Sequence, residues 1–337
     1  MTPPAVRYLV LWVTAACNLR CAYCYRRPGR DAVMPIAVAR AALALAAASG
    51  QPFHVQLTGG EPTLEPAVIE AVGRMVRQAG WPATLALQTN GTRLDTALIE
   101  LCRRYDIGIG VSIDGPPEVQ ERVRGSAAAT FRGLRLLERA ALPVRVTAVL
   151  SSANVARLRE LVLCLGVYPN VSGVGLDPVV AAGAARHAEA LMPDPEAVRR
   201  GVRAMYAAVS GLNRLRARPF QWRECAAVER ALAGDAPVRP YCHACRGESL
   251  AIHPDGTAYP CAQAVGDPAM QVGDVDAVDW ARLRAVYHGV QLRGECAACA
   301  LSGRCPGDCP SRLVYNAGAA PVMCRIYQTI ADVLSRR

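Results

Sequence analysis

The chain has 337 residues, which is long enough for one large domain or two ordinary ones to bury a full core without disulfide bonds. Its formal net charge is +10, and its basic residues are all arginine, scattered through helical stretches and not gathered in one block. This pattern favours solvated helix faces over a nucleic-acid surface, and the absence of lysine excludes Schiff-base chemistry.

The sequence also lacks the marks of a membrane or secreted protein. It contains no run of 18 uncharged apolar residues, and its N-terminus does not have the charged start and cleavage site of a secretory signal. We therefore expect a cytoplasmic protein with no membrane partner, in which thiols stay reduced. Its 14 cysteines then indicate metal binding or catalysis more than disulfides.

Strand-like and helix-like segments alternate through the first half of the chain. Helical spacing appears in the segments between strands, such as 35–49 and 65–80. Six β units separated by helices predict a parallel α/β architecture, and polar or glycine residues at each strand's carboxyl end mark the place where a site should form. The predicted strands are 8–14, 53–58, 84–89, 107–114, 144–150 and 171–177.

The pattern changes after residue 190. Segments 194–218 and 225–234 have helical spacing, and the chain is rich in cysteine from 241 onward. Residues 249–261 contain a Pro-Asp-Gly turn between two short apolar runs, which predicts a hairpin, and 324–337 predicts a closing helix. We divide the chain into a barrel region 1–195, a helical bridging region 196–240 and a cysteine-rich region 241–337.

Three cysteines follow the first predicted strand in the sequence CNLRCAYC. Cys17, Cys21 and Cys24 have the spacing C-x3-C-x2-C. Three thiolates on one loop can hold three irons of a cubane cluster and leave the fourth iron open to a ligand. A zinc site would need a fourth ligand, and a helix would place the three cysteines on one face, so these remain as alternatives at this point.

The stretch CNLRCAYCY resembles the signature of the radical S-adenosylmethionine (SAM) enzymes. The resemblance implies that Cys17, Cys21 and Cys24 hold a [4Fe–4S] cluster, that SAM chelates the open iron, and that Tyr23 lies beside the adenine. It also implies one-electron cleavage of SAM to a 5′-deoxyadenosyl radical. The implied fold is a partial (β/α)6 TIM-type barrel, in agreement with the six strands counted above.

The second and third strand ends fit the same resemblance. In TGGEP, Gly59 and Gly60 let the backbone approach the SAM ammonium, and Glu61 adds a carboxylate. In QTNG, Thr89 or Asn90 can bond the ribose, although an Asx-turn is the alternative for this sequence. Each motif by itself would describe only a turn.

The fourth strand end supplies three more candidates for SAM binding. In VSIDGPPEVQERVRG, Ser112 and Arg124 are candidates for the SAM carboxylate, and Asp114 for the ribose or a turn. Helix capping or a surface ion pair would explain the same residues equally well.

The cysteines of the second half resemble the seven-cysteine SPASM extension of radical SAM peptide and protein maturases. The spacing is C-x10-G-x4-C followed by C-x2-C-x5-C-x3-C and a last cysteine, and Cys242 fits an eighth position. By analogy, auxiliary cluster I takes Cys242, Cys245, Cys261 and Cys309, and auxiliary cluster II takes Cys296, Cys299, Cys305 and Cys324. Spacing by itself leaves a zinc ribbon open, which would make the region a zinc-stabilised binding module.

The remaining titratable candidates are few. Cys102 and Cys164 stand in apolar helical contexts and read as core thiols, whereas Cys225 is a weak candidate for donating a proton or hydrogen atom. Asp177 ends the sixth strand and is our candidate for a catalytic acid or base, with a turn cap as the alternative.

The resemblance as a whole implies a small cysteine-rich α+β SPASM module after the barrel, three [4Fe–4S] clusters and SAM. The expected reaction removes hydrogen from a residue of a peptide or small protein and gives an oxidative modification or cross-link. Expected partners are that substrate and a flavodoxin- or ferredoxin-type electron donor. Because the first strand begins by residue 8, any leader recognition is expected from the barrel surface, the cysteine-rich region or a separate leader-binding protein.

Two alternatives stay within this enzyme class. One is a dehydrogenase or carbon–carbon coupling enzyme of small-molecule or cofactor biosynthesis. The other is sulfatase maturation, against which two residues speak. Sulfatase-maturing enzymes carry an aspartate where Ala262 follows Cys261, and tend to carry glutamine where Thr58 precedes Gly59.

Overall fold

The computed structural model describes residues 5–27, 29, 31–187, 191–234, 240–290, 296, 299–305, 307–317 and 322–336. Its central feature is one curved sheet of nine strands in the order β7-β6-β5-β4-β3-β2-β1-β8-β9. All neighbouring strands are parallel except β8 and β9, which are antiparallel. The predicted parallel α/β architecture is confirmed.

The six strands predicted for the first half are all present, and two of them match to the residue. The sheet consists of β1 (Tyr8–Thr14), β2 (Phe53–Gly59), β3 (Ala83–Thr89), β4 (Ile107–Ser112), β5 (Val144–Leu150), β6 (Val171–Pro178), β7 (Gln221–Trp222), β8 (Ser249–Ile252) and β9 (Ala258–Tyr259).

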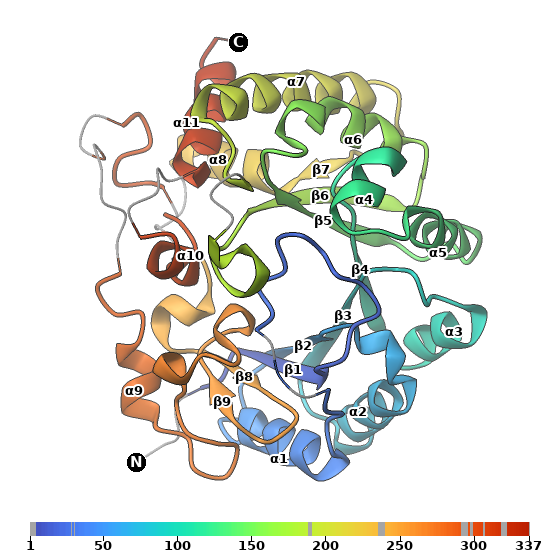
Figure 1. Cartoon of the computed structure of the whole chain (residues 1–337), viewed down its shortest axis with the longest axis vertical. Coiled ribbons are helices and arrows are strands. Elements are labelled where there is room, and N and C mark those ends of the chain that lie inside the picture. The colour runs from blue at the N-terminus through green and yellow to red at the C-terminus, as the bar shows by residue number, and fades with distance from the viewer. Residues whose placement is uncertain are drawn as a thin grey trace.

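The described helices are α1 (Ile36–Ala47), α2 (Pro66–Ala79), α3 (Thr96–Arg104), α4 (Pro117–Val123), α5 (Ala127–Arg139), α6 (Leu158–Gly166), α7 (Pro195–Asn213), α8 (Arg223–Ala233), α9 (Trp280–Ala285), α10 (Pro310–Tyr315) and α11 (Val322–Leu334). Several of them, such as α1, α2, α3, α5 and α6, cover the outer face of the sheet (Figure 1). The segment after β1, drawn in blue, crosses the middle of the ring that the strands form (Figure 1).

The two faces of the sheet have different chemistry because side chains alternate along a strand. On the outer face, Leu9 and Leu11 of β1 are fully buried in the main core against the helices. On the inner face, polar side chains bond across neighbouring strands, as Gln88 does to Ser112 (Nε2 to Oγ, 2.9 Å). The inner face is therefore partly polar and suits a hydrophilic ligand.

The cysteine-rich region joins the same sheet. The predicted hairpin is present, but its first strand, β8, pairs with β1 from Tyr8↔Ser249 to Leu11↔Ile252. The closing helix α11 packs against α7 and α8. The sheet thus continues across the expected boundary at residue 241. None of the helices in the described ranges is long and apolar enough to cross a membrane.

Candidate active site at the carboxyl ends of the strands

The cysteine loop, residues 15–27, leaves β1 at the carboxyl edge of the sheet and carries three partly exposed thiols. Burial raises the pKa of Cys21 to about 11, and the neighbouring charges of Cys24 and Cys17 add to this rise while Arg124 opposes it. The three thiols therefore lie close enough to influence one another electrostatically. This donor set fits a cluster bound through three sulfurs.

Gly59 and Gly60 allow the end of β2 to lie directly against the cysteine loop. A Cβ on Gly60 would lie 2.1 Å from the carbonyl oxygen of Ala16, and one on Gly59 would lie 2.3 Å from that of Thr14. The backbone closes the gap with hydrogen bonds from Gly60 N to Thr14 O and from Glu61 N to Ala16 O, both 2.8 Å. The close approach that requires glycine here is to the loop backbone.

Glu61 is buried, with 1% of its surface exposed, and it is surrounded by donors of the protein itself. Its carboxylate accepts hydrogen bonds from the hydroxyls of Thr63 and Thr89, both at 2.6 Å, and from Asn90 N at 2.7 Å. Burial raises the pKa of Glu61 even though these bonds lower it. The carboxylate and the Thr89 hydroxyl thus hold the ends of β2 and β3 together.

The amide of Asn90 joins the third strand end to the cysteine loop. Its Oδ1 accepts from Thr92 N at 2.9 Å, which is the Asx-turn weighed above, and its Nδ2 donates to Asn18 Oδ1 at 3.0 Å. Asn18 in turn donates to Thr92 Oγ1 at 2.8 Å. Asn18 lies inside the cysteine signature and was missed, because its spacing predicts no contact with residues more than 70 positions away.

Asp114, Arg124 and Tyr23 form a buried group beside the cysteine loop. Asp114 is completely buried and accepts hydrogen bonds from Arg124 Nε at 2.7 Å, from Val149 N at 2.8 Å and from the Tyr23 hydroxyl. Arg124 keeps 10% of its side chain exposed, and its guanidinium lies 5.2 Å from the centre of the Tyr23 ring. The surface ion pair weighed as an alternative is in fact a buried one.

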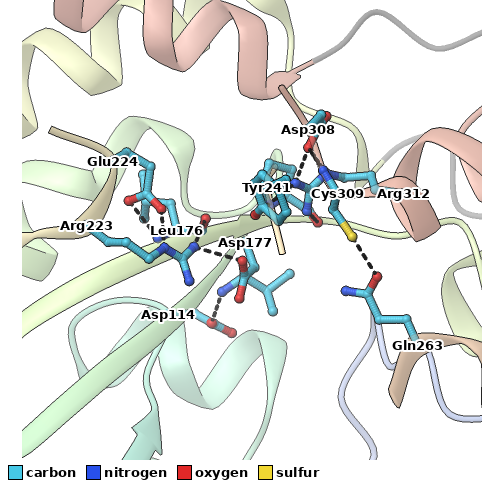
Figure 2. Close-up of polar contacts among 12 residues, drawn as sticks. Asp114, Leu176, Asp177, Arg223, Glu224, Tyr241, Gln263, Asp308, Cys309 and Arg312 are labelled. Atoms are coloured by element: carbon cyan, nitrogen blue, oxygen red, sulfur yellow. Dashed lines mark hydrogen bonds and ion pairs between the residues drawn. The ribbon is translucent and has the colours of Figure 1, made fainter. Parts of the chain in front are cut away.

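Asp177 lies at the carboxyl end of β6 and is paired with Arg223 (Figure 2). Arg223 Nη2 donates to Asp177 Oδ1 at 2.8 Å and to Leu176 O at 2.6 Å, and its Nε donates to Glu224 at 2.6 Å. Burial would raise the pKa of Asp177, but Arg223 and Arg312 lower it by more. Asp177 therefore stays ionised at neutral pH, and a third of its side chain is exposed (33%).

A second arginine ties the cysteine-rich region to this strand end. Arg312 is 3% exposed, bonds Asp308 and donates to the Tyr241 hydroxyl at 3.3 Å (Figure 2). Nearby, Asn316 donates to Val179 O at 2.8 Å. The i, i+4 spacing of Asp308 and Arg312 could have predicted their pair, whereas Arg223 had no local signal.

The eight cysteines of the second half fall into two groups. Burial raises the pKa of Cys309 to about 12, and Cys261 adds to the rise; Cys242 feels the charges of both Cys245 and Cys309. Burial also raises the pKa of Cys324 to about 12, with added effects of the other three thiols in its group. The groups are Cys242, Cys245, Cys261 and Cys309, and Cys296, Cys299, Cys305 and Cys324.

Each group supplies four sulfurs, the number that closes a four-iron cluster. Within the ranges that the structure describes, no set of three or more Cys, His, Asp or Glu side chains is arranged to hold a single metal ion.

The three other cysteines lie away from these groups. Cys102 is 1% exposed in the main core, and Cys164 packs against that core. Cys225, the weak catalytic candidate, is also buried in the core, and its Sγ donates to Glu229 at 3.6 Å within α8. Cys225 follows Arg223 and Glu224 in α8, and its catalytic role stays a prediction.

Comparison with known proteins agrees with this geometry. Residues 13–162 match the family model described as the radical SAM superfamily. The matched stretch begins at Val13 in β1 and contains the cysteine loop and strands β2 to β5. Residues 13–162 therefore form a radical SAM domain.

Two curated relatives and one solved structure describe the likeness further. An uncharacterized protein of Methanocaldococcus jannaschii, MJ0907, is 29% identical over 51% of the chain and 62% of its own length. A serine-type anaerobic sulfatase-maturating enzyme of Klebsiella aerogenes is 26% identical over 99% of the chain and 86% of its own length. Native anSMEcpe with bound AdoMet and Cp18Cys peptide superposes with a TM-score of 0.81 at 18% identity, covering 99% of this chain and 98% of that one.

At this identity the structural likeness concerns the fold. It extends over the second half, so this chain has the fold of that structure from β1 to α11. The resemblance read from the cysteine spacings is confirmed at this level.

Proposed function

We propose that this radical SAM enzyme removes hydrogen from a residue of a peptide or small protein and leaves an oxidative modification or a cross-link. The observation that carries the proposal is the place of Tyr25. Tyr25 follows Cys24 on the cysteine loop and packs against the same buried cluster as Cys261, and burial raises its pKa with added effects of the charges of Cys24 and Cys261. A radical generator and an electron acceptor would then face one substrate site.

The proposed ligand sets follow the three groups of thiols. Cys17, Cys21 and Cys24 would hold the SAM cluster, and the two groups of four would hold auxiliary clusters I and II as assigned above. With SAM bound, the first cluster would supply one-electron cleavage to the 5′-deoxyadenosyl radical. The residues proposed to form the SAM site, by direct contact or by positioning, are Gly59 and Gly60 through their backbone, together with Tyr23, Glu61, Thr89, Asn90, Ser112, Asp114 and Arg124.

Several of these side chains would act on SAM indirectly. The carboxylate of Glu61 holds Thr89 and the backbone of Asn90, so it would fix the rim of the site. Arg124 is held by Asp114 on one side, and the face of its guanidinium covers Tyr23. Positioning of this kind reduces the reorganisation needed when SAM binds.

Asp177 is our proposed base. A substrate radical that gives up an electron must also release a proton, and an ionised, partly exposed carboxylate at the strand end can accept it. Arg223 would keep that carboxylate charged and fixed in direction. Gly175 makes room for the arginine, because a Cβ there would lie 2.7 Å from Arg223 Cζ.

Sulfatase maturation is a second candidate, favoured by the match to the Klebsiella aerogenes enzyme over 99% of the chain. Ala262 and Thr58 still stand where that class has aspartate and tends to have glutamine. A purified sulfatase-derived peptide, incubated with enzyme, SAM and reductant, separates the two candidates. Conversion of its target residue would support sulfatase maturation.

The proposed function is tested by two measurements on protein reconstituted without oxygen. About twelve irons per chain with SAM cleavage are expected for three cubane clusters, whereas two zincs and intact SAM would refute an enzyme of this class. A small peptide coexpressed with the protein should lose about 2 Da by mass spectrometry, the mass of two hydrogens. An unchanged peptide beside a consumed metabolite would favour a small-molecule dehydrogenase.

A further inference from the structure

Two side chains contact the sulfurs assigned to auxiliary cluster I. Cys261 Sγ lies 3.3 Å from the Tyr287 hydroxyl, and Cys309 Sγ lies 3.4 Å from the side-chain amide of Gln263 (Figure 2 shows the second contact). Among the described residues, the sulfurs assigned to the other two clusters accept hydrogen bonds from the backbone, as Cys17 does from Leu19 N at 3.5 Å.

Both side chains are fixed by their surroundings. Tyr287 follows α9 and is 3% exposed, so its ring has little freedom to move. The backbone oxygen of Gln263 accepts a hydrogen bond from Arg27 Nη1 at 3.1 Å, and Arg27 also pairs with Asp267 at 3.0 Å. Since Arg27 ends the cysteine loop, the two cluster regions are joined through this residue.

Cluster binding fixes the direction of these hydrogen bonds. A ligated sulfur carries no proton and can only accept, so the Tyr287 hydroxyl must donate to Cys261. The thiol of Cys309 donates to Gln263 Oε1 in the metal-free geometry. A 180° flip of the Gln263 side-chain amide exchanges its oxygen and nitrogen positions and lets Nε2 donate to the Cys309 sulfur.

Donors of this kind favour the reduced cluster. Reduction adds one negative charge to the cluster and its sulfurs, and hydrogen bonds to those sulfurs stabilise that charge. The reduction potential therefore rises. A cluster with these two side-chain donors should therefore be easier to reduce than the same cluster without them.

We propose that Tyr287 and Gln263 raise the reduction potential of auxiliary cluster I and so make it the acceptor of the substrate's electron. The inference rests on the proposed function. In that reaction the substrate would give a hydrogen atom to the 5′-deoxyadenosyl radical, then one electron to auxiliary cluster I and one proton to a base. The substrate loses two hydrogens in total, and the donor supplies the separate electron that cleaves SAM.

The test measures the potentials themselves. A parent protein carrying Cys17→Ala, Cys21→Ala and Cys24→Ala keeps only the two auxiliary clusters, and EPR-monitored redox titration then gives two potentials. Tyr287→Phe should lower one of them so that reduction is about tenfold less favourable, about 59 mV for one electron. Gln263→Leu should lower the same potential. Tyr315→Phe is the control, because that hydroxyl donates to Asp267 at 2.7 Å and not to a sulfur.

The outcomes separate this inference from the function on which it rests. Unchanged reduction potentials in both variants would overturn the inference. If the unmodified protein still held about twelve irons and cleaved SAM, the proposed function would stand. Loss of four irons from both variants, in place of a shift, would also overturn the inference, because the two residues would then serve assembly. A parent that binds zinc in place of iron would refute the proposed function as well.

Discussion

Replacing Asp114 by asparagine should strongly destabilise the protein. The substitution keeps the shape of the side chain but removes the charge that faces Arg124 Nε at 2.7 Å and accepts from Val149 N at 2.8 Å. The arginine side chain is 10% exposed and Asp114 is 0% exposed, so the guanidinium would remain buried without its partner. Breaking a buried pair in this way costs about 3–5 kcal/mol.

The measurement is urea unfolding of the metal-free protein under reducing conditions, followed by far-UV circular dichroism. Asp106→Asn is the matched control, because Asp106 is 98% exposed in its ion pair with Arg77. That substitution should leave the free energy of unfolding unchanged within error. A loss below about 1 kcal/mol for Asp114→Asn would show that the buried pair does not stabilise this strand end.

Three further results are expected. Gly60→Ala should displace the cysteine loop, because the new Cβ would lie 2.1 Å from the carbonyl oxygen of Ala16. The iron content of the reconstituted protein should then fall by about one third, four of twelve irons. Gly29→Ala is the control and should leave the iron content unchanged, because a Cβ there would have nothing within 4 Å. The pKa of Asp177 is lowered in the folded state, so its charge should stabilise the protein relative to Asp177→Asn above about pH 4, and this stability should fade as the pH falls through the pKa of the folded state. Urea unfolding at several pH values measures the difference between the two proteins, and a difference that stays constant with pH would contradict the prediction. Removing iron with a chelator and mild oxidation should lower the melting temperature seen by circular dichroism, because the thiol groups of the second half would lose the clusters that join them, and an unaltered melting curve would argue against this role.

Local patterns were sufficient for most of the sheet. The strands 8–14 and 144–150 were predicted to the residue, because apolar runs of this length bounded by turn signals have few other interpretations. The two-residue β7 was not predicted, since so short a strand has no periodicity. The pairing of β8 with β1 was also missed, because it joins segments about 240 positions apart.

The sequence predicted which residues lie at the site better than it predicted which partners they contact. The sequence placed Glu61 and Asp114 at strand ends, which is where they lie, but it could not tell that protein donors surround both carboxylates. The pairing of Asp177 with Arg223 likewise depends on the fold, since the two residues are 46 positions apart. Sequence spacing shows which polar side chains lie near the site, and the packing of the fold decides which of them are already hydrogen-bonded within the protein.

The pairing of β8 with β1 has a consequence for how the chain can vary. Strand β1 is held on one side by β2 and on the other by β8. Deleting the chain after residue 240 would leave a row of unpaired backbone groups along an apolar strand, which is a surface that other chains can add to. A shortened barrel should therefore aggregate, and the cysteine-rich half protects the solubility of the strand that leads into the cysteine loop.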